Sequence, residues 1–310
     1  MSPSAQRPKI VVLGGINMDL AATAARMPAP GETLIGEAFL TYPGGKGANQ
    51  AVAAARLGAS VRMVGRVGCD TFGPVLLEGL RREGIDVSGV AEDPERPSGV
   101  AMILLDADRQ NYIVAVYGAN MACDGVQVRA VEQALHDADV LMLQLETPLE
   151  TSLAAASLAR EMGVRVVWDP APAVALSAEA YAACDVLTPN QVEAEFLVGV
   201  KVTDAASAEA AAEKLLALGA NTVVVKLGED GAYLASRDER GFVPPFPVQV
   251  EDTVAAGDAF AGALAVALSQ GSTMTEAVRY GCAAGALAVT RSGAQDAMPT
   301  RAEVDALVQG

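Results

Sequence analysis

The hydrophobic positions along this chain follow two alternating periodicities. Short apolar runs, typical of buried strands, recur at 9–15, 61–67, 140–145, 164–168, 186–187 and 222–227. Apolar residues at helical spacing predict helices at 51–57, 72–83, 126–138, 207–218 and 259–268, with others beginning near 151, 177 and 192. Because strand–helix alternation produces parallel strands with crossover helices packed on them, we predict an α/β fold. We expect one domain, residues 1–310, with a Rossmann-like, mostly parallel central sheet and helices on both faces.

Two segments interrupt this rhythm with additional β-structure. Residues 20–42 have a strand-like pattern broken by prolines and a glycine, and residues 98–117 contain two apolar runs joined by a polar turn at 106–111. Hairpin-like strands cannot continue a parallel sheet. We therefore place both segments together as a small antiparallel β lid, formed by about 17–43 and 97–118, above a ligand crevice.

Composition and charge narrow the class of protein. The chain has 310 residues, 51% of them hydrophobic, so it can bury the core of one large domain. A net charge of −16 disfavours a nucleic-acid partner, because nucleic acid attracts a basic surface. Residues 1–9 lack the apolar core of a signal peptide, and no apolar run has the ~18 residues of a membrane span. We expect a cytoplasmic protein without nucleic-acid or membrane partners.

The cysteine and histidine residues argue against several kinds of enzyme. The four cysteines are widely spaced without a C-x-x-C pair, which suits reduced cytosolic thiols better than disulfides or a zinc site. His136 is the only histidine, so a Ser-His-Asp hydrolase or a histidine-rich metal site would depend on it alone. We expect His136 to lie on the surface of a helix.

Polar residues stand just after several predicted strands. Asn17 and Asp19 follow the first strand, Glu146 follows the third and Asp169 the fourth. In a parallel α/β sheet, these positions line the ligand crevice at the carboxyl edge. The dinucleotide fingerprint G-x-G-x-x-G is absent, which disfavours an oxidoreductase.

The segment Gly44–Gln50, with the sequence GGKGANQ, is a predicted loop that leads into a helix from residue 51. Lys46 is followed by Gly47 rather than Ser or Thr, so the segment is not a Walker A loop. It is either an ordinary glycine-rich turn or a loop whose glycines let the backbone close around a small polar ligand, with Lys46 and Asn49 beside it.

The segment Asp252–Phe260, with the sequence DTVAAGDAF, runs directly into an apolar helix. Free N–H groups in the first turn and the positive end of the helix dipole favour an anion, phosphate above all. Asp258 in that turn either caps the helix or accepts a proton from a hydroxyl that attacks the phosphate.

Asn190 and Glu193 stand three residues apart at the entrance of another predicted helix. This spacing places an amide and a carboxylate on one face of the helix. The pair is either a helix cap or a site that reaches a phosphate-bound Mg²⁺ through water.

Three of these motifs together resemble the ribokinase-like (PfkB) family of sugar and nucleoside kinases. Gly44–Asn49 resembles the first family signature, Asp252–Asp258 resembles the second, and Asn190-x-x-Glu193 is similar to the family's magnesium and phosphate motif. Two long signatures in this order are highly specific, and the resemblance covers nearly the whole chain. It implies the ribokinase-like fold and ATP-dependent phosphorylation of a primary hydroxyl, that of D-ribose, to give ribose 5-phosphate. It also implies ATP, Mg²⁺ and K⁺ as cofactors and a homodimer formed through the β lid.

The resemblance assigns roles residue by residue. For catalysis it implies Asp258 as the base, with the backbone N–H groups of Ala255, Ala256 and Gly257 as the anion hole for the transferred phosphoryl group. The implied sugar-binding positions are Asn17, Asp19, Gly45, Lys46, Asn49 and Glu146, and the nucleotide-binding positions are Asn190, Lys226, Gly228, Gly231, Gly257 and Cys282. Glu193 would organise Mg²⁺ indirectly, and a monovalent cation is implied at Asp252, Val254, Ala288, Arg291 and Gly293.

Four positions depart from the usual pattern of this family. Ala297 stands where related kinases usually carry a serine near the cation. Cys282 stands where a polar residue often flanks the adenine, so mainly apolar contacts are expected there. Met18 and Trp168 are bulkier than the usual residues near the sugar pocket and the sheet end.

Other functions stay open at this point. A related kinase would act on fructose, 2-keto-3-deoxygluconate or a nucleoside, although Asp19, Glu146 and the complete G-G-K-G-A-N set favour a small pentose. A catalytically silent sugar-binding regulator on the same fold would need no base, so the intact Asp258 disfavours it.

Overall fold

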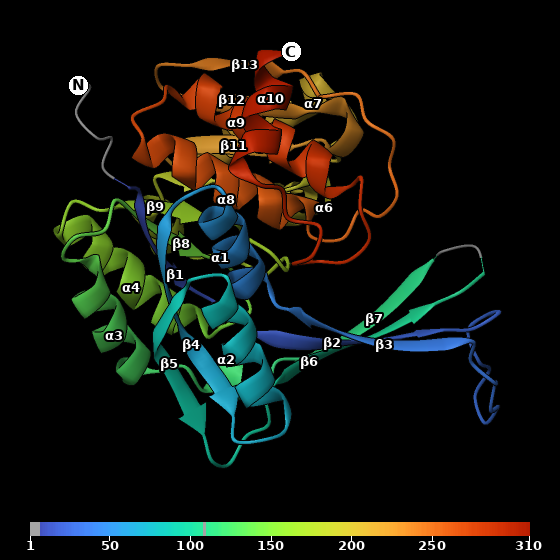
Figure 1. Ribbon diagram of the computed structural model, residues 1–310. Coiled ribbons are helices and arrows are strands. Elements are labelled where there is room, and N and C mark those ends of the chain that lie inside the picture. The colour runs from blue at the N-terminus through green and yellow to red at the C-terminus, as the bar shows by residue number, and fades with distance from the viewer. Residues whose placement is uncertain (1–6, 108–109) are drawn as a thin grey trace.

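A twisted, mostly parallel sheet forms the centre of the molecule (Figure 1). The computed structural model describes residues 7–107 and 110–310. Within them, one sheet has nine strands in the order β13-β12-β11-β10-β9-β8-β1-β4-β5. These strands are β1 (Lys9–Leu13), β4 (Ser60–Gly68), β5 (Asp86–Asp93), β8 (Val140–Leu143), β9 (Arg165–Trp168), β10 (Val186–Leu187), β11 (Thr222–Lys226), β12 (Ala232–Ser236) and β13 (Arg240–Val243). The pairs from β11 to β5 are parallel, and β12 and β13 add an antiparallel edge.

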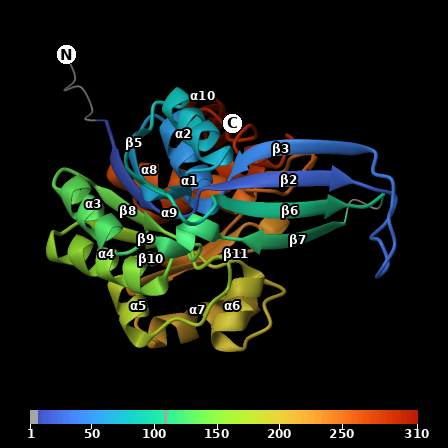
Figure 2. The same cartoon turned by 90° about the horizontal axis from the view of Figure 1, so that it is seen from below.

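Helices cover both faces of this sheet (Figure 2). One layer contains α1 (Lys46–Arg56), α2 (Phe72–Arg82), α8 (Ala256–Ser269), α9 (Met274–Ala288) and α10 (Arg301–Gln309). The other contains α3 (Gly125–Leu135), α4 (Leu149–Glu161), α5 (Ala178–Ala183), α6 (Gln191–Val198) and α7 (Ala205–Ala217). Alternate side chains of a strand point to opposite faces. Accordingly, Ile10 and Val12 pack in the first core, and Val11 and Leu13 in the second. The predicted α/β fold is confirmed.

A second sheet projects from the side of the main body (Figures 1 and 2). It contains β2 (Asn17–Thr23), β3 (Ala38–Gly44), β6 (Gly99–Leu105) and β7 (Asn111–Val116) in the order β3-β2-β6-β7. The outer pairs are antiparallel, as predicted, but the central β2–β6 pair is parallel. Both central strands leave the main body at the same point, where Asn17 pairs with Gly99. The predicted hairpin turn at 106–111 includes residues 108–109, which lie outside the described residues, as does most of the N-terminal segment 1–9.

Several elements differ from the sequence prediction. The segment predicted as a glycine-rich loop is helical from Lys46, because Gly45 adopts φ +91° as the N-cap and the helix begins directly after it. Gly47 is inside the helix, where a Cβ would lie 2.6 Å from the carbonyl carbon of Gly14. The hydrophobic pattern also failed to predict β5, β12, β13, α9 and α10. The edge strands β5 and β13 carry mixed burial rather than a continuous apolar run.

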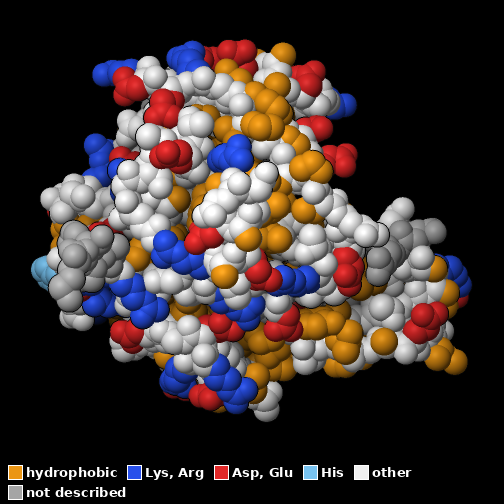
Figure 3. All heavy atoms as spheres, turned by 45° about the horizontal axis from the view of Figure 1, so that its top comes forward, with side chains coloured by type: hydrophobic (Ala, Val, Ile, Leu, Met, Phe, Trp, Pro, Cys, Tyr) orange, Lys and Arg blue, Asp and Glu red, His pale blue; other side chains and the backbone are white. Residues whose placement is uncertain are grey.

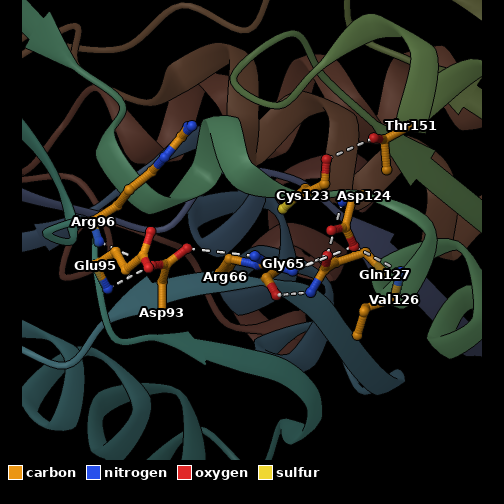
Figure 4. A network of polar contacts seen from close by, with 10 residues as sticks. All are labelled: Gly65, Arg66, Asp93, Glu95, Arg96, Cys123, Asp124, Val126, Gln127 and Thr151. Atoms are coloured by element: carbon orange, nitrogen blue, oxygen red, sulfur yellow. Dashed lines mark hydrogen bonds and ion pairs between the residues drawn. The ribbon is translucent and has the colours of Figure 1, made fainter.

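A polar network fastens the start of α3, which follows the 3₁₀ helix η1 (Gly118–Ala122), to the sheet (Figure 4). Arg66 on β4 forms ion pairs with Asp93 at 3.4 Å and with Asp124 at 3.3 Å. Gln127 accepts a hydrogen bond from Arg66 at 3.2 Å and donates one to the carbonyl of Gly65 at 3.2 Å. These contacts fix the chain that precedes α3.

The described residues include four free thiols and a surface of mixed charge (Figure 3). No described helix is both long and apolar enough to cross a membrane. Charges of both signs are interspersed on the face shown in Figure 3. All four cysteines are free thiols, and His136 is exposed at the C-cap of α3, as expected for a surface residue.

Candidate active site

The side chains singled out in the sequence meet at the carboxyl edge of the main sheet. Glu146 and Asp169 follow β8 and β9, and both are almost fully buried. Asn49 enters from the first turn of α1, and Asp258 from the first turn of α8. The two helices pack closely, because a Cβ on Gly262 would lie 2.7 Å from the Cβ of Ala53. This contact holds the two family signatures against each other.

The N-terminus of α8 is built around an unusual backbone conformation. Its N-cap, Ala255, adopts the left-handed region with φ +59°, which is unfavourable for a residue with a Cβ. Asp252 braces the approach, because its Oδ1 accepts the N–H of Val254 at 3.0 Å. No side chain caps the helix at Ala255. Its first-turn N–H groups therefore have no capping side chain as an acceptor.

The carboxylate of Asp258 is held by side chains rather than by helix N–H groups. Oδ2 accepts a hydrogen bond from Asn49 at 2.9 Å, and Oδ1 accepts one from Gln50 at 3.1 Å. Burial raises the pKa of Asp258 above its usual range, although the ammonium of Lys46 opposes this shift. A carboxylate with a raised pKa accepts a proton more readily. The Asp258 carboxylate is thus bonded to two side chains of α1, and it does not cap α8.

A second cluster forms around Glu146. Its Oε2 accepts the backbone N–H of Lys46 at 2.7 Å, and its Oε1 lies 3.5 Å from Nδ2 of Asn17. Asn120 donates to Oδ1 of Asn17 at 2.8 Å and also bonds the backbone of Ile16. Sequence reasoning missed Asn120, because no motif surrounds it and only the folded chain brings η1 to β2.

Charged groups crowd this cluster. Burial and the Asp258 carboxylate raise the pKa of Asp19 to about 6. Burial also raises the pKa of Glu146 to about 7, against the effect of Lys46. Burial acts to lower the pKa of Lys46, but Asp258, Asp169, Glu146 and Glu193 outweigh it and raise that pKa. The single ammonium therefore balances several carboxylates.

Two glycines are required by this crowding. A Cβ on Gly44 would lie 2.4 Å from Oδ2 of Asp19, and one on Gly45 would lie 2.6 Å from the carbonyl oxygen of Gly15.

One acceptor at this site, Oδ1 of Asn49, has no hydrogen-bond partner among the described residues. Asn49 is only 6% exposed, so this oxygen is a buried acceptor without a partner.

A third group of residues is centred on Lys226 at the end of β11. Lys226 at the end of β11 forms an ion pair with Asp169 at 2.7 Å. Its ammonium faces the N-terminus of α8, because a Cβ on Gly257 would lie 3.3 Å from Nζ. Asn190 pairs with Lys226 through an isolated parallel bridge. The site thus places a cation beside the anion-binding turn.

Asn190 and Glu193 form the helix cap that the sequence left as one alternative. The side chain of Asn190 accepts the N–H of Glu193 at 2.8 Å, and Glu193 accepts the N–H of Asn190 at 2.8 Å. Burial and the nearby Asp169 raise the pKa of Glu193 to about 6. No group of three or more His, Cys, Asp or Glu side chains in the described parts of the chain is arranged to hold a metal directly. The pair therefore fits Mg²⁺ only through water or together with substrate phosphates.

The residues assigned to a monovalent cation come from two segments that lie side by side. Asp252 accepts the N–H of Gly293 at 3.2 Å, and the carbonyl of Val289 accepts the N–H of Glu251 at 2.7 Å. Ser292 also donates to Glu251 at 2.8 Å. Carboxylate and carbonyl oxygens are suitable ligands for such an ion.

Other assigned residues lie at the edge of the site or away from it. Gly228 and Gly231 form the turn between β11 and β12, which contains the 3₁₀ helix η2 (Gly228–Asp230), and both have positive φ angles. Cys282 is half-buried on α9, where it packs against the core. Met18 lies on β2 between Asn17 and Asp19, and Trp168 is the last residue of β9 at the sheet end; both are buried.

Comparison with known proteins identifies the class of this protein. The family model described as pfkB family carbohydrate kinase matches residues 7–301. The chain belongs to this family and is therefore a phosphotransferase that acts on a sugar hydroxyl.

Individual relatives agree with this assignment. The chain is 41% identical to a ribokinase of Haemophilus influenzae, over 96% of this chain and 97% of the relative. It is 37% identical to a deoxyribokinase of Salmonella typhi, over 94% and 95% respectively. The structure of Arabidopsis thaliana ribokinase complexed with ribose and ATP superposes with a TM-score of 0.91 at 33% identity, covering 98% of this chain and 100% of that one.

Proposed function

We propose that this protein is an ATP-dependent kinase that phosphorylates the 5-hydroxyl of D-ribose. The observation that carries the proposal is the buried Asp258 carboxylate, held by Asn49 and Gln50 at the uncapped N-terminus of α8. A base and an anion-binding turn are the two elements that phosphoryl transfer to a hydroxyl requires. The likeness to ribokinases over the full chain favours ribose as the sugar.

The sugar is proposed to lie between Asp19, Asn49 and Glu146. Oδ1 of Asn49 would accept a hydrogen bond from one sugar hydroxyl, since it has no partner among the described residues. Asp19 and Glu146 would accept hydrogen bonds from the others, and Asn17 would support Glu146. The ammonium of Lys46 and the backbone at Gly45 would complete the pocket.

The phosphoryl transfer follows from the same geometry. Asp258 would take the proton of the 5-hydroxyl as that oxygen attacks the γ-phosphorus of ATP, and the bond from the γ-phosphorus to the β,γ-bridging oxygen would break to release ADP. The N–H groups of Ala255, Ala256 and Gly257 would bind the transferring phosphoryl oxygens, with Lys226 beside them. Negative charge that develops there is then stabilised by donors already in place.

The nucleotide and the metal ions have separate proposed positions. ATP would lie along Asn190, Lys226 and the glycine turn after β11, with Cys282 beside the adenine. Mg²⁺ bound to the ATP phosphates would neutralise their charge, and Glu193 would orient its water ligands. A monovalent cation, K⁺, would be held by Asp252 and by the carbonyl groups of Val254, Ala288, Arg291 and Gly293. Ala297 is buried and supplies no side-chain oxygen there.

The projecting sheet is proposed as a lid on a single domain and as the interface of a homodimer. Side chains paired across neighbouring strands share a face. Ile103 pairs with Ile113 on one side and with Ala21 on the other, on the face that also carries Asp19. The opposite face includes Met102 and Val114, and both are more than half exposed. Exposed apolar residues of this kind favour a partner, here a second copy, in a cytoplasmic enzyme.

The proposal is tested by ADP release from ATP over a panel of sugars. The panel contains D-ribose, 2-deoxy-D-ribose, fructose, 2-keto-3-deoxygluconate and nucleosides, with Asp258→Asn as the control for contaminating kinases. 2-Deoxyribose belongs in it because one relative is a deoxyribokinase. We expect the highest kcat/KM for ribose. Tight ribose binding without ADP release would favour the sugar-binding regulator, and a preference for another sugar would refute the ribose assignment.

A further inference from the structure

Gln50 lies between two buried carboxylates. Its Nε2 donates to Oδ1 of Asp258 at 3.1 Å and to Oδ2 of Asp169 at 3.1 Å. The side chain is fully buried in the second turn of α1. Because ionised carboxylates only accept hydrogen bonds, the amide nitrogen must face them, and its two hydrogens serve one carboxylate each.

Gln144 holds this orientation from behind. Its Nε2 donates to Oε1 of Gln50 at 2.5 Å, so Gln50 cannot flip without losing three hydrogen bonds. In this position Oε1 of Gln144 is buried and has no partner among the described residues. A Cβ on Gly14 would lie 1.9 Å from that oxygen, so only glycine fits there. A buried acceptor without a partner lowers the stability of the fold. Gln144 keeps this orientation because its Nε2 then faces Gln50 and holds that side chain in place.

Asp169, the second carboxylate bonded by Gln50, connects to the first turn of α8 through Lys226. Asp169 accepts a hydrogen bond from Lys226 at 2.7 Å, and the ammonium of Lys226 faces Gly257 in the first turn of α8. The contacts therefore run from Asp258 through Gln50 and Asp169 to Lys226. This chain of side chains joins the base to the cation beside the anion-binding turn.

We propose that Gln50 is a positioning residue of the phosphoryl transfer. It holds Asp258 in one orientation toward the attacking hydroxyl, and it keeps Asp169 against Lys226 on the phosphate side. This inference rests on the proposed function of Asp258 as the base. Gln50 itself need not touch the sugar or the nucleotide, so its removal acts on the chemical step more than on binding.

The charges around Asp258 determine what removal of Gln50 does. Lys46 on α1 faces the carboxylate, and so do Asp169 after β9, Asp19 on β2 and Glu146 after β8. Without the two donors of Gln50, the repulsion between Asp169 and Asp258 is no longer offset by a shared hydrogen-bond partner. The protonated form of Asp258 is then favoured, and the acid limb of the rate profile moves to higher pH.

The test compares Gln50→Leu with the wild-type protein. We expect kcat to fall by about 10- to 100-fold, while KM for ribose changes by less than about threefold because the sugar contacts remain. The acid limb of kcat against pH should move to higher pH. Gln144→Met releases Gln50 without touching either carboxylate, and it should produce the same changes at smaller size.

Gln127→Leu is the matched control, because it removes a buried glutamine from the network of Figure 4. It should lower thermal stability and leave kcat and its pH profile unchanged.

The inference is overturned if folded Gln50→Leu keeps kcat and the pH profile of kcat at wild-type values. It is also overturned if kcat falls but the acid limb of the profile stays at the same pH. If Gln50→Leu does not fold, Gln144→Met decides by the same two criteria. An inactive Asp258→Asn beside a normal Gln50→Leu would refute this inference alone, whereas an active Asp258→Asn would refute the proposed function.

Discussion

Asp258 and Val114 occupy opposite environments in the same chain. The carboxylate of Asp258 is 4% exposed, and each of its oxygens accepts a hydrogen bond from a neighbouring side chain. Val114 on β7 is 62% exposed and lies in a sheet whose free faces are largely apolar. The crevice thus buries charge inside the protein, and the projecting sheet exposes hydrophobic side chains to solvent.

This difference shows where function resides in the molecule. Buried polar groups are stable only with specific partners, so each partner around Asp258 restricts the position of the next. Exposed apolar side chains need no specific partner, but they become stable when another surface covers them. We therefore expect substitutions in the crevice to change chemistry and binding, and substitutions in the sheet to change association.

The largest effect is expected from Asp258→Asn. The amide keeps the shape of the side chain but cannot accept the hydroxyl proton, so kcat should fall by about 10²- to 10⁴-fold. Binding of ribose and ATP, measured by calorimetry, should remain close to that of the wild type. A kcat near the wild-type value would show that Asp258 is not the base.

Asp19→Ala should act on binding instead. Asp19 is expected to bond sugar hydroxyls that do not react, so KM for ribose should rise by about 10- to 100-fold, the effect of losing one hydrogen bond to a charged group. The value of kcat at saturating ribose should change much less. A loss of kcat without a rise in KM would show that Asp19 acts in catalysis and not in sugar binding.

Replacement of K⁺ should have a smaller effect. If a cation braces Asp252 and the N-cap of α8, then exchange of K⁺ for tetramethylammonium at constant ionic strength should lower kcat several-fold. Asp252→Ala should abolish the difference between the two salts. Equal rates of the wild-type protein in both salts would mean that the cation site is absent, and the missing side-chain oxygen at Ala297 would be the first explanation.

Val114→Lys should leave the chemistry nearly unchanged and break the dimer. A lysine on the face opposite to Asp19 cannot be buried against a second copy without a large desolvation penalty. Sedimentation should show a dimer for the wild type and a monomer for this variant. Ile113→Lys, on the face of Asp19, is the matched change and should raise KM for ribose while the dimer persists. A monomeric wild-type protein would show that the apolar face has no partner of its own kind.

The same comparison explains how far the sequence alone was informative. The apolar periodicity predicted most strands and helices of the main body, because they are buried and repeat regularly. It failed for β5 and β13, which lie at the two edges of the sheet and alternate less clearly. It also placed Lys46 in a loop, since three glycines nearby conceal the start of α1.

For the site, motifs identified the residues that a local signature contains. Asp258, Asn49 and Asn190 stand inside such signatures, and the fold brings all three to the carboxyl edge of the sheet. Gln144 and Asn120 act only through contacts with distant segments, and neither has a recognisable pattern around it. Only the hydrogen bonds of the folded chain connect them to the residues of the site.

The most direct test of the central claim is the position of the phosphate on the product. After incubation of the wild-type protein with ATP and ¹³C-labelled ribose, carbon–phosphorus coupling in NMR spectra identifies the phosphorylated oxygen. Our account predicts coupling at C5, because the primary hydroxyl reaches Asp258 and the N-terminus of α8 together. Coupling at C1, or unchanged ribose beside consumed ATP, would contradict it.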